Sequence, residues 1–204
     1  MTPAADRTVF VVDDDAAALD SLLMLLRSDG LNPSGFSSAN AFLGALSPDA
    51  RGCVISDVRM PGMDGVQLLR TLKERRCSLP VILITGHADV TGAVQAMKAG
   101  AAEFVQKPFE SDLILRLVRA SLDDNDDAVD ASASRNRVRS RIESLTAREH
   151  QVLDLIMDGA SNKAIAATLT ISPRTVEIYR ANVMSKMRAE SLSDLIRMTL
   201  SSAT

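Results

Sequence analysis

The sequence predicts an α/β domain with a doubly wound, five-stranded parallel sheet, followed by a small all-α helix-turn-helix domain. Three observations lead to this prediction. From Arg7 to about Asp123, short apolar runs alternate five times with longer amphipathic stretches. After Arg135 no strand pattern remains, and helix start signals follow one another. An acidic segment separates the two parts, so we expect domains at residues 1–122 and 141–204 with a linker at 123–140.

The strands are expected where the apolar runs fall. The first, third and fourth runs are almost entirely apolar, which is typical of parallel strands buried on both faces. The five expected strands are Thr8–Val12, Asn32–Phe36, Cys53–Asp57, Val81–Thr85 and Glu103–Gln106.

The helices of the first domain are expected between the strands, where leucine and valine recur at spacings of three and four residues. Gly30 and Gly100 are expected to end two of them. The expected helices are Ala16–Ser28, Ala39–Leu46, Val66–Arg75, Val90–Ala99 and Glu110–Leu122.

The acidic run from Asp123 to Asp127 continues into alanine and serine up to Ser134, which indicates a linker or a frayed helix extension. Net charge changes across it. Residues 1–121 hold 12 basic and 14 acidic residues, 122–134 hold none and 5, and 135–204 hold 11 and 7. The C-terminal part is therefore the one expected to meet a polyanion.

The N-terminus and the cysteines exclude an exported or membrane protein. No apolar run reaches the ~18 residues that span a bilayer, and Met1 to Arg7 lacks the features of a signal peptide. Cys53 and Cys77 have no metal-type spacing, and both are expected to stay reduced. We expect a soluble, cytoplasmic protein that does not bind membranes.

Polar residues gather at the C-terminal ends of the expected strands. Asp13, Asp14 and Asp57 fall at the C-terminal ends of the first and third strands, which are neighbours in a doubly wound sheet. Crowded carboxylates repel and are best neutralised by a hard divalent cation, for which Mg²⁺ is the natural choice. Thr85 adds a hydroxyl and Lys107 an ammonium. Such a site can bind a phosphoryl group, which an aspartate accepts covalently.

Two details refine this pocket, and one alternative competes with it. Gly86 would let the backbone approach the oxygens closely, and Pro108 can hold a cis peptide that aims Lys107 inward. A lone aspartate at a strand end is more often a helix cap or turn former, and Asp15 is interpreted in that way. The full set of residues favours the phosphoryl pocket.

The segments FVVDDD, VISDVRMPGMDG, VILITGHADV and EFVQKPFE resemble the signature segments of response-regulator receiver domains, over residues 7–122. The resemblance implies Asp57 as phosphoacceptor, and Mg²⁺ held by Asp13, Asp14, Asp57 and the backbone carbonyl of Arg59. It also implies that Thr85 senses the phosphoryl oxygen, that Lys107 pairs with it and that Phe104 is the switch aromatic. Val90, Val94 and Lys98 then lie on the face through which such domains dimerise, although such a stripe is more often core.

Short amphipathic helices with clear start signals make up the second domain. Thr146 to Glu149 is a capping box, and Ser172-Pro173 places a cap before a proline at the first helical position. The expected helices are Ala147–Asp158, Asn162–Leu169, Pro173–Met187 and Leu192–Leu200.

The helix Pro173–Met187 follows Asn162–Leu169 after a very short turn. Val176, Val183 and Met187 are spaced to face the core. The outward residues, which can enter a major groove, are Thr175, Glu177, Ile178, Ala181, Asn182 and Ser185. A basic fringe that can contact phosphates is formed by Lys163, Arg174, Arg180, Lys186 and Arg188. Glu177 can accept a hydrogen bond from cytosine. The alternative is a plain αα-hairpin with a solvated charged face.

The run from LTAREH to VMSKM is similar to the LuxR-type, or NarL-type, DNA-binding domain of transcriptional regulators, over about 60 residues. Its domain order and the segments SPRTVE and RANVMSKM most resemble rhizobial regulators of nitrogen-fixation genes. His150 and Tyr179 depart from the residue types frequent in that family. The resemblance implies a sensor histidine kinase, promoter DNA and RNA polymerase as partners, a homodimer formed on phosphorylation, and activation of nitrogen-fixation or low-oxygen genes.

Two other functions fit parts of the chain. An aspartyl-phosphate phosphohydrolase would use Asp57 as nucleophile, but it needs a second carboxylate where Arg59 stands. A phosphorylation-independent DNA-binding scaffold would leave the acidic pocket without a role. We therefore expect a regulator and not an enzyme.

Overall fold

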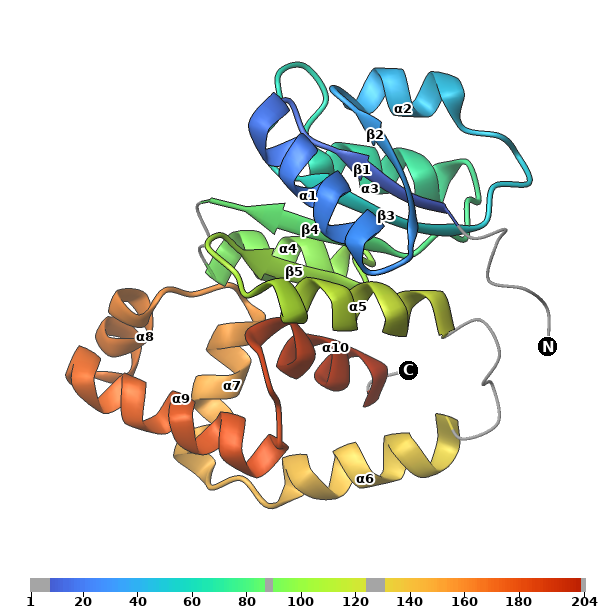
Figure 1. Cartoon of the computed structure of the whole chain (residues 1–204). Coiled ribbons are helices and arrows are strands. Elements are labelled where there is room, and N and C mark those ends of the chain that lie inside the picture. Colours follow the sequence, from blue (N-terminus) through green and yellow to red (C-terminus); the bar gives the residue numbers. More distant parts are fainter. Residues whose placement is uncertain (1–7, 87–89, 124–130, 203–204) are drawn as a thin grey trace. The chain divides into compact units, whose positions relative to one another are not determined.

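The computed structural model describes residues 8–86, 90–123 and 131–202, with side chains from residue 137 onward in the last range (Figure 1). The chain forms two compact units. The first contains all five strands with α1, α2, α3 and α5, and the second contains α4 and α6 to α10. Among the described helices, none is both long and apolar enough to cross a membrane.

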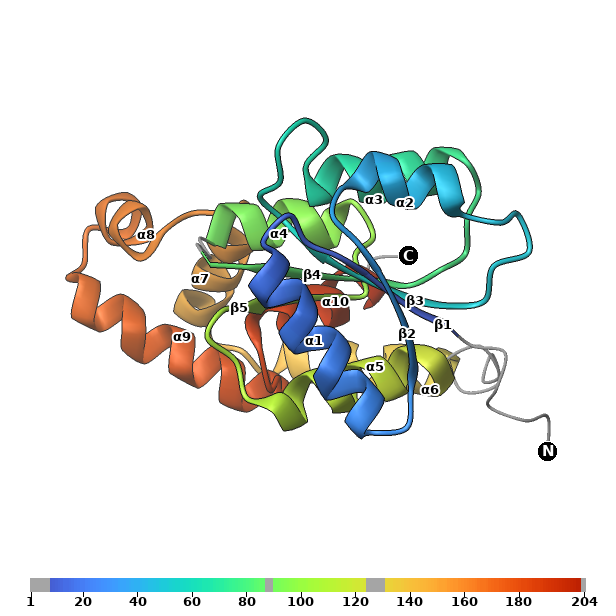
Figure 2. The ribbon, with the colours of Figure 1, turned by 45° about the horizontal axis from the view of Figure 1, so that its top comes forward.

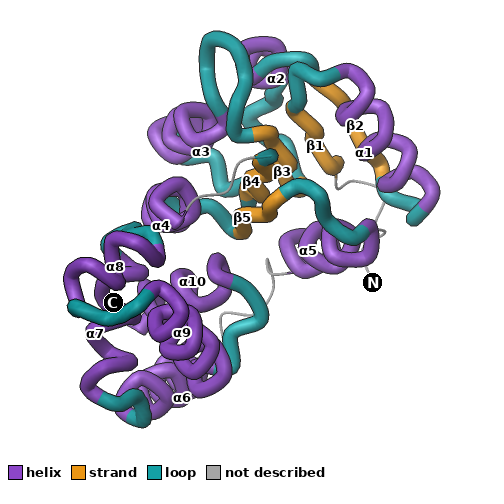
Figure 3. The backbone as a smooth tube through the Cα atoms, turned by 90° about the vertical axis from the view of Figure 1, so that its left-hand side faces the viewer, coloured by secondary structure: helices purple, strands orange, loops and turns teal. Residues whose placement is uncertain are grey.

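The first unit is built on a parallel sheet with the strand order β2-β1-β3-β4-β5. Helices α1 and α5 cover one face, and α2 and α3 cover the other (Figure 3). The elements are β1 (Thr8–Val12), α1 (Ala16–Ser28), β2 (Asn32–Phe36), α2 (Ala39–Ala45), β3 (Gly52–Asp57), α3 (Gly65–Glu74), β4 (Val81–Thr85), β5 (Glu103–Gln106) and α5 (Ser111–Asp123). The doubly wound sheet predicted from the sequence is confirmed.

The core of the first unit explains why the central strands are so apolar. Val9, Val11, Ile55 and Ile82 are at most 1% exposed. They pack with apolar residues of α1 and α5, including Leu26 and others of the same buried cluster. Burial on both faces removes the alternation of polar and apolar residues that a half-exposed strand would show.

The second unit is all-helical. It contains α4 (Val90–Lys98), α6 (Ala131–Glu143), α7 (Ala147–Met157), α8 (Asn162–Leu169), α9 (Pro173–Met187) and α10 (Leu192–Ser202). Val152, Ile165, Val176, Val183 and Leu195 are fully buried in one cluster. Figure 2 shows α8 and α9 joined by their short connection.

The structure differs from the expected boundaries by one or two residues at several helix ends. Helix α3 begins at Gly65 because Asp64 caps it in a box with Gln67, and α7 ends at Met157 because Asp158 is its C-cap. Helix α6 lies where the sequence indicated a linker or a helix extension. Gly30 and Gly100 end their helices with φ of 78° and 90°, as predicted. Both cysteines are free.

Candidate functional site

The register of the sheet brings the predicted polar residues to one edge. Val12 pairs with Ser56, so Asp13 and Asp57 follow at the same level on neighbouring strands. Thr85, the last residue of β4, pairs with Gln106, and Lys107 follows it directly. Strand order reverses between β1 and β3, which is where doubly wound sheets bind their ligands.

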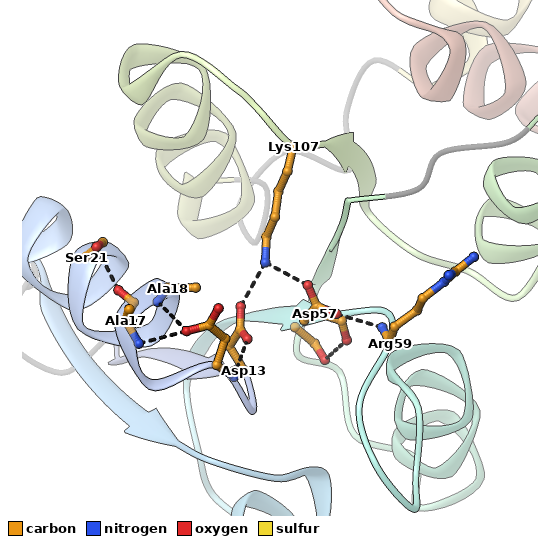
Figure 4. A network of polar contacts seen from close by, with 9 residues as sticks. Asp13, Ala17, Ala18, Ser21, Asp57, Arg59 and Lys107 are labelled. Atoms are coloured by element: carbon orange, nitrogen blue, oxygen red, sulfur yellow. Dashed lines mark hydrogen bonds and ion pairs between the residues drawn. The ribbon is translucent and has the colours of Figure 1, made fainter.

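Lys107 joins two carboxylates at this edge. Its Nζ lies 2.7 Å from Oδ1 of Asp57 and 3.0 Å from Oδ2 of Asp13. Figure 4 shows the lysine reaching down between the two aspartates. The side chains of Asp13 and Asp57 are only 4% and 11% exposed, so these ion pairs are poorly screened by water. Burial lowers the pKa of Lys107, but hydrogen bonds to Asp57 and Asp13 outweigh it and raise the pKa above its ordinary value.

The second oxygen of Asp57 is held by the backbone. Oδ2 accepts the N–H of Arg59 at 2.7 Å, while Oδ1 faces Lys107 (Figure 4). This carboxylate is therefore oriented by one donor on each oxygen. An oriented and only partly exposed carboxylate is suited to nucleophilic attack.

The remaining aspartates after β1 lie differently. Asp14 is exposed. Asp15 caps α1 by accepting the N–H groups of Ala17 and Ala18 at 2.9 and 3.2 Å, which agrees with its interpretation as a cap. Asp13 accepts the N–H of Asp15 at 2.9 Å through Oδ1, which leaves Oδ2 for Lys107.

Within the described residues, no group of three or more acidic, histidine or cysteine side chains is close enough to hold a metal. Two carboxylates, from Asp13 and Asp57, nevertheless face one cation, the Lys107 ammonium. Mg²⁺ usually takes one or two carboxylates and completes its shell with water, so the oxygen donors present fit this ion.

The two predicted switch residues lie on adjacent strands. Thr85 is 1% exposed at the end of β4, and Phe104 is half-buried in β5. Phe104 pairs in register with Leu83, two residues before Thr85. The Lys107–Pro108 peptide is cis, as predicted.

Local sequence signals build the helix-turn-helix of the second unit. Ser161 caps α8 and Ser172 caps α9, with Pro173 at the first turn. Thr170 ends α8 in the left-handed conformation, with φ 56°. The turn Thr170 to Ser172 is therefore as short as the sequence predicted, and α9 begins directly after it.

Helix α9 presents two faces. Val176, Val183 and Met187 are fully buried, as predicted. Ile178 is 56% exposed, which is unusual for a large apolar side chain. Thr175 is half-buried. The other predicted outward residues are exposed, namely Glu177, Ala181, Asn182 and Ser185.

The predicted basic fringe divides into two groups. Lys163, Arg174, Lys186 and Arg188 are exposed, and Arg180 is half-buried. Arg180 donates from Nη1 to Oδ1 of Asn162 at 3.1 Å, and its burial lowers its pKa. Lys186 places Nζ 2.7 Å from Oε2 of Glu149. The last two cations thus already have partners within the unit.

Sequence reasoning missed two contributors to this unit. Glu149, placed only as part of a capping box, is 3% exposed and also receives the ion pair from Lys186. Arg141 of α6 donates to the carbonyl of Met187 at 3.0 Å. The spacing of Val138, Ile142 and Leu145 at three and four residues was the available signal that α6 packs on this core.

Two families match the chain. The receiver domain of response regulators matches residues 9–119, and the family described as bacterial regulatory proteins, luxR family, matches residues 143–199. The transcriptional regulatory protein FixJ of Azorhizobium caulinodans is 50% identical over 192 residues, covering 94% of this chain and 91% of that protein.

Two further likenesses extend over nearly the whole chain. FixJ of Bradyrhizobium diazoefficiens is 46% identical over 192 residues, and the alignment covers 94% of this chain and 94% of that protein. A crystal structure of full-length FixJ from B. japonicum aligns with a TM-score of 0.57 at 45% identity and covers 97% of both chains. The similarity therefore includes both domains.

Proposed function

The chain belongs to the two-component response regulators that join a receiver domain to a LuxR-type DNA-binding domain, and from this we propose that phosphorylation of Asp57 controls how it binds DNA. The observation that carries the proposal is the pair of contacts from Lys107 to Asp57 and Asp13, in a chain whose second unit holds a helix-turn-helix.

In the proposed reaction, a carboxylate oxygen of Asp57 attacks the phosphorus of a phosphohistidine on a sensor kinase. A P–O bond forms, the P–N bond breaks and the histidine nitrogen leaves. The ammonium of Lys107, 2.7 Å from Asp57, offsets the negative charge that arrives with the phosphoryl group. The backbone N–H of Arg59 keeps the carboxylate oriented.

Asp13, Asp14, Asp57 and the backbone carbonyl of Arg59 would hold Mg²⁺ in this proposal. When bound, the ion neutralises and orients the oxygens of the phosphoryl group. The phosphoryl group stays on this chain, because its acceptor is Asp57 and its partner is Lys107. Arg59 stands where a phosphohydrolase would need an acid or base to hydrolyse the phosphoaspartate. The product is thus a phosphorylated regulator and not a hydrolysed metabolite.

The proposed response begins at Thr85, which lies beside the pocket, and at Phe104 on the next strand. Their rearrangement would favour a homodimer whose two helix-turn-helix units bind paired half-sites in promoter DNA in the cytoplasm. Base readers would be Thr175, Glu177, Ile178, Ala181 and Asn182, with phosphate contacts from Lys163, Arg174 and Arg180. RNA polymerase recruited there would transcribe the target genes, for which nitrogen fixation or low oxygen is the proposed setting.

The experiment uses the full chain with Mg²⁺ and beryllofluoride. Its mass in solution and its affinity for a duplex selected from a random pool are measured with and without the activator. The proposal predicts that dimer content and affinity both rise in the wild type and in Asp15→Asn, because asparagine caps α1 as well as aspartate. Neither should rise in Asp57→Asn. An equal rise in Asp57→Asn would refute the proposal.

A further inference from the structure

The C-terminal end of α9 is held by an ion pair between Lys186 and Glu149. The helical spacing of Lys186 does not predict this pair, because it places the residue on the outward face. Lys186 Nζ lies 2.7 Å from Oε2 of Glu149, whose side chain is 4% exposed. The same oxygen accepts the N–H of Thr146 at 2.7 Å, so the carboxylate is fixed at the start of α7. A buried charge of this kind is strongly unfavourable without its partner. Lys186, although 37% exposed itself, thus compensates a buried charge of the unit.

Two more hydrogen bonds reach the same end of the helix. Arg141 Nη1 donates to the carbonyl of Met187 at 3.0 Å, and Lys186 Nζ donates to the carbonyl of Ser144 at 3.5 Å. The last turn of α9 is therefore tied to α6, to the segment after it and to α7. Such ties restrict both the tilt and the axial rotation of α9.

We infer that the Glu149–Lys186 ion pair sets the orientation of α9 for specific base reading, which makes Lys186 a positioning residue and not a phosphate contact. This inference rests on the proposed DNA binding. Glu177 lies nine residues before Lys186, or ~13 Å along the helix axis, so a tilt of ~10° at the anchored end moves it by ~2 Å. Specific contacts need placement to within ~0.5 Å.

The two possible roles of Lys186 give opposite results for Glu149→Gln. If Lys186 contacted phosphate, removing a neighbouring negative charge would free the lysine and raise affinity for any DNA. If the pair positions α9, the same substitution lowers affinity for the specific site and leaves nonspecific binding unchanged. Thr146→Ala serves as the control, because it loses the hydroxyl at the start of α7 but keeps the backbone N–H that Glu149 accepts.

The test compares full-length variants with Mg²⁺ and beryllofluoride on a duplex selected by the wild type and on a scrambled duplex of equal composition. Glu149→Gln and Lys186→Met are each expected to weaken binding to the selected duplex by at least about tenfold, with scrambled binding and the salt dependence unchanged. Lys163→Met, an exposed control, should weaken both and reduce the slope of log K against log salt by about 0.9. Thr146→Ala should keep the preference for the selected duplex.

Higher affinity of Glu149→Gln for both duplexes, or a salt slope reduced by Lys186→Met, would overturn the inference. Hydrogen exchange of the amides of Met184 to Met187 gives a readout that needs no DNA. It should accelerate in Glu149→Gln and not in Thr146→Ala. If the wild type binds the selected and the scrambled duplex equally well, the proposed function fails. Unchanged amide hydrogen exchange of Met184 to Met187 in Glu149→Gln would reject the positioning role independently of any DNA measurement.

Discussion

The ammonium of Lys107 lies 2.7 Å from Oδ1 of Asp57, and the same nitrogen lies 3.0 Å from Oδ2 of Asp13. One cation thus lies between two poorly exposed carboxylates that stand at the same level on adjacent strands, and it offsets part of their negative charge. The pairing reduces the repulsion between these carboxylates, and it places a positive charge beside the proposed phosphoacceptor. The contact therefore contributes both to stability and to the proposed chemistry.

Replacing Lys107 by methionine should destabilise the first unit, because two carboxylates lose their shared partner. We expect the free energy of unfolding to fall by about 1 to 3 kcal/mol, with Mg²⁺ restoring part of the loss. Thermal unfolding across a Mg²⁺ titration measures both effects. The exposed Lys73→Met is the control and should change little. Equal melting of the wild type and Lys107→Met without Mg²⁺ would contradict this role.

Substituting two isoleucines of the second unit should affect stability in one case and DNA binding in the other. Ile165 is fully buried, so Ile165→Ala should cost about 2 to 5 kcal/mol of unfolding free energy. Ile178 is 56% exposed, so Ile178→Ala should stay within about 0.5 kcal/mol yet weaken binding to a selected duplex. Chemical denaturation and DNA titration of both variants test the pair. Undiminished DNA binding by Ile178→Ala would remove this residue from the reading face.

The stability of the second unit should depend on Glu149 in acid. Hydrogen bonds from Lys186 and from the Thr146 backbone lower the pKa of Glu149 to about 2, from an ordinary value of 4.5. The folded state therefore gains stability from this group above pH 4.5 and loses it as pH falls towards 2. Melting temperature should drop less steeply over this interval in Glu149→Gln than in the wild type. Parallel curves for the two proteins would exclude the effect.

A side chain at Gly65 should disturb the backbone that carries Asp57. An added Cβ would lie 2.3 Å from the Asp57 carbonyl oxygen, so the start of α3 or the end of β3 has to move. We expect Gly65→Ala to cost about 1 to 3 kcal/mol and to slow phosphorylation by acetyl phosphate. Gly44→Ala, in the last turn of α2 with open space around it, is the matched control and should stabilise by at most about 1 kcal/mol. Similar unfolding free energies for the two variants would refute the clash.

The strands were the most predictable part of the molecule. Four have the bounds expected from the sequence, and β3 begins one residue earlier, at Gly52. Apolar runs between turn residues are a local signal, and the carboxyl ends of parallel strands meet at one edge, so the gathering of Asp13, Asp57 and Lys107 followed from topology alone. The bridging of both aspartates by Lys107 depends on side-chain conformation, which topology does not determine.

The packing of helix α6 and the partner of Lys186 could not be predicted from the sequence. The acidic and small residues from Asp123 to Ser134 indicate a linker, and the short apolar spacing of Val138, Ile142 and Leu145 is a weak signal beside them. The packing of Val138 against the second unit shows that the stretch is structured. Helical spacing locates the Cα of a residue on one face of a helix, and it therefore predicts Lys186 among the phosphate contacts. A long side chain can nevertheless turn back to a buried carboxylate, and Glu149 is 37 positions away in the sequence.

Measuring DNA affinity and the phosphorylation of Asp57 in the same sample tests whether the receiver domain controls DNA binding. The full chain is treated with acetyl phosphate and Mg²⁺, the fraction of phosphorylated Asp57 is determined by mass spectrometry of its peptide, and binding to a selected duplex is titrated in parallel. If phosphorylation of Asp57 controls DNA binding, affinity should rise in proportion to that fraction, and Asp57→Asn should show neither change. Phosphorylation of Asp57 with no change in DNA affinity would contradict this control.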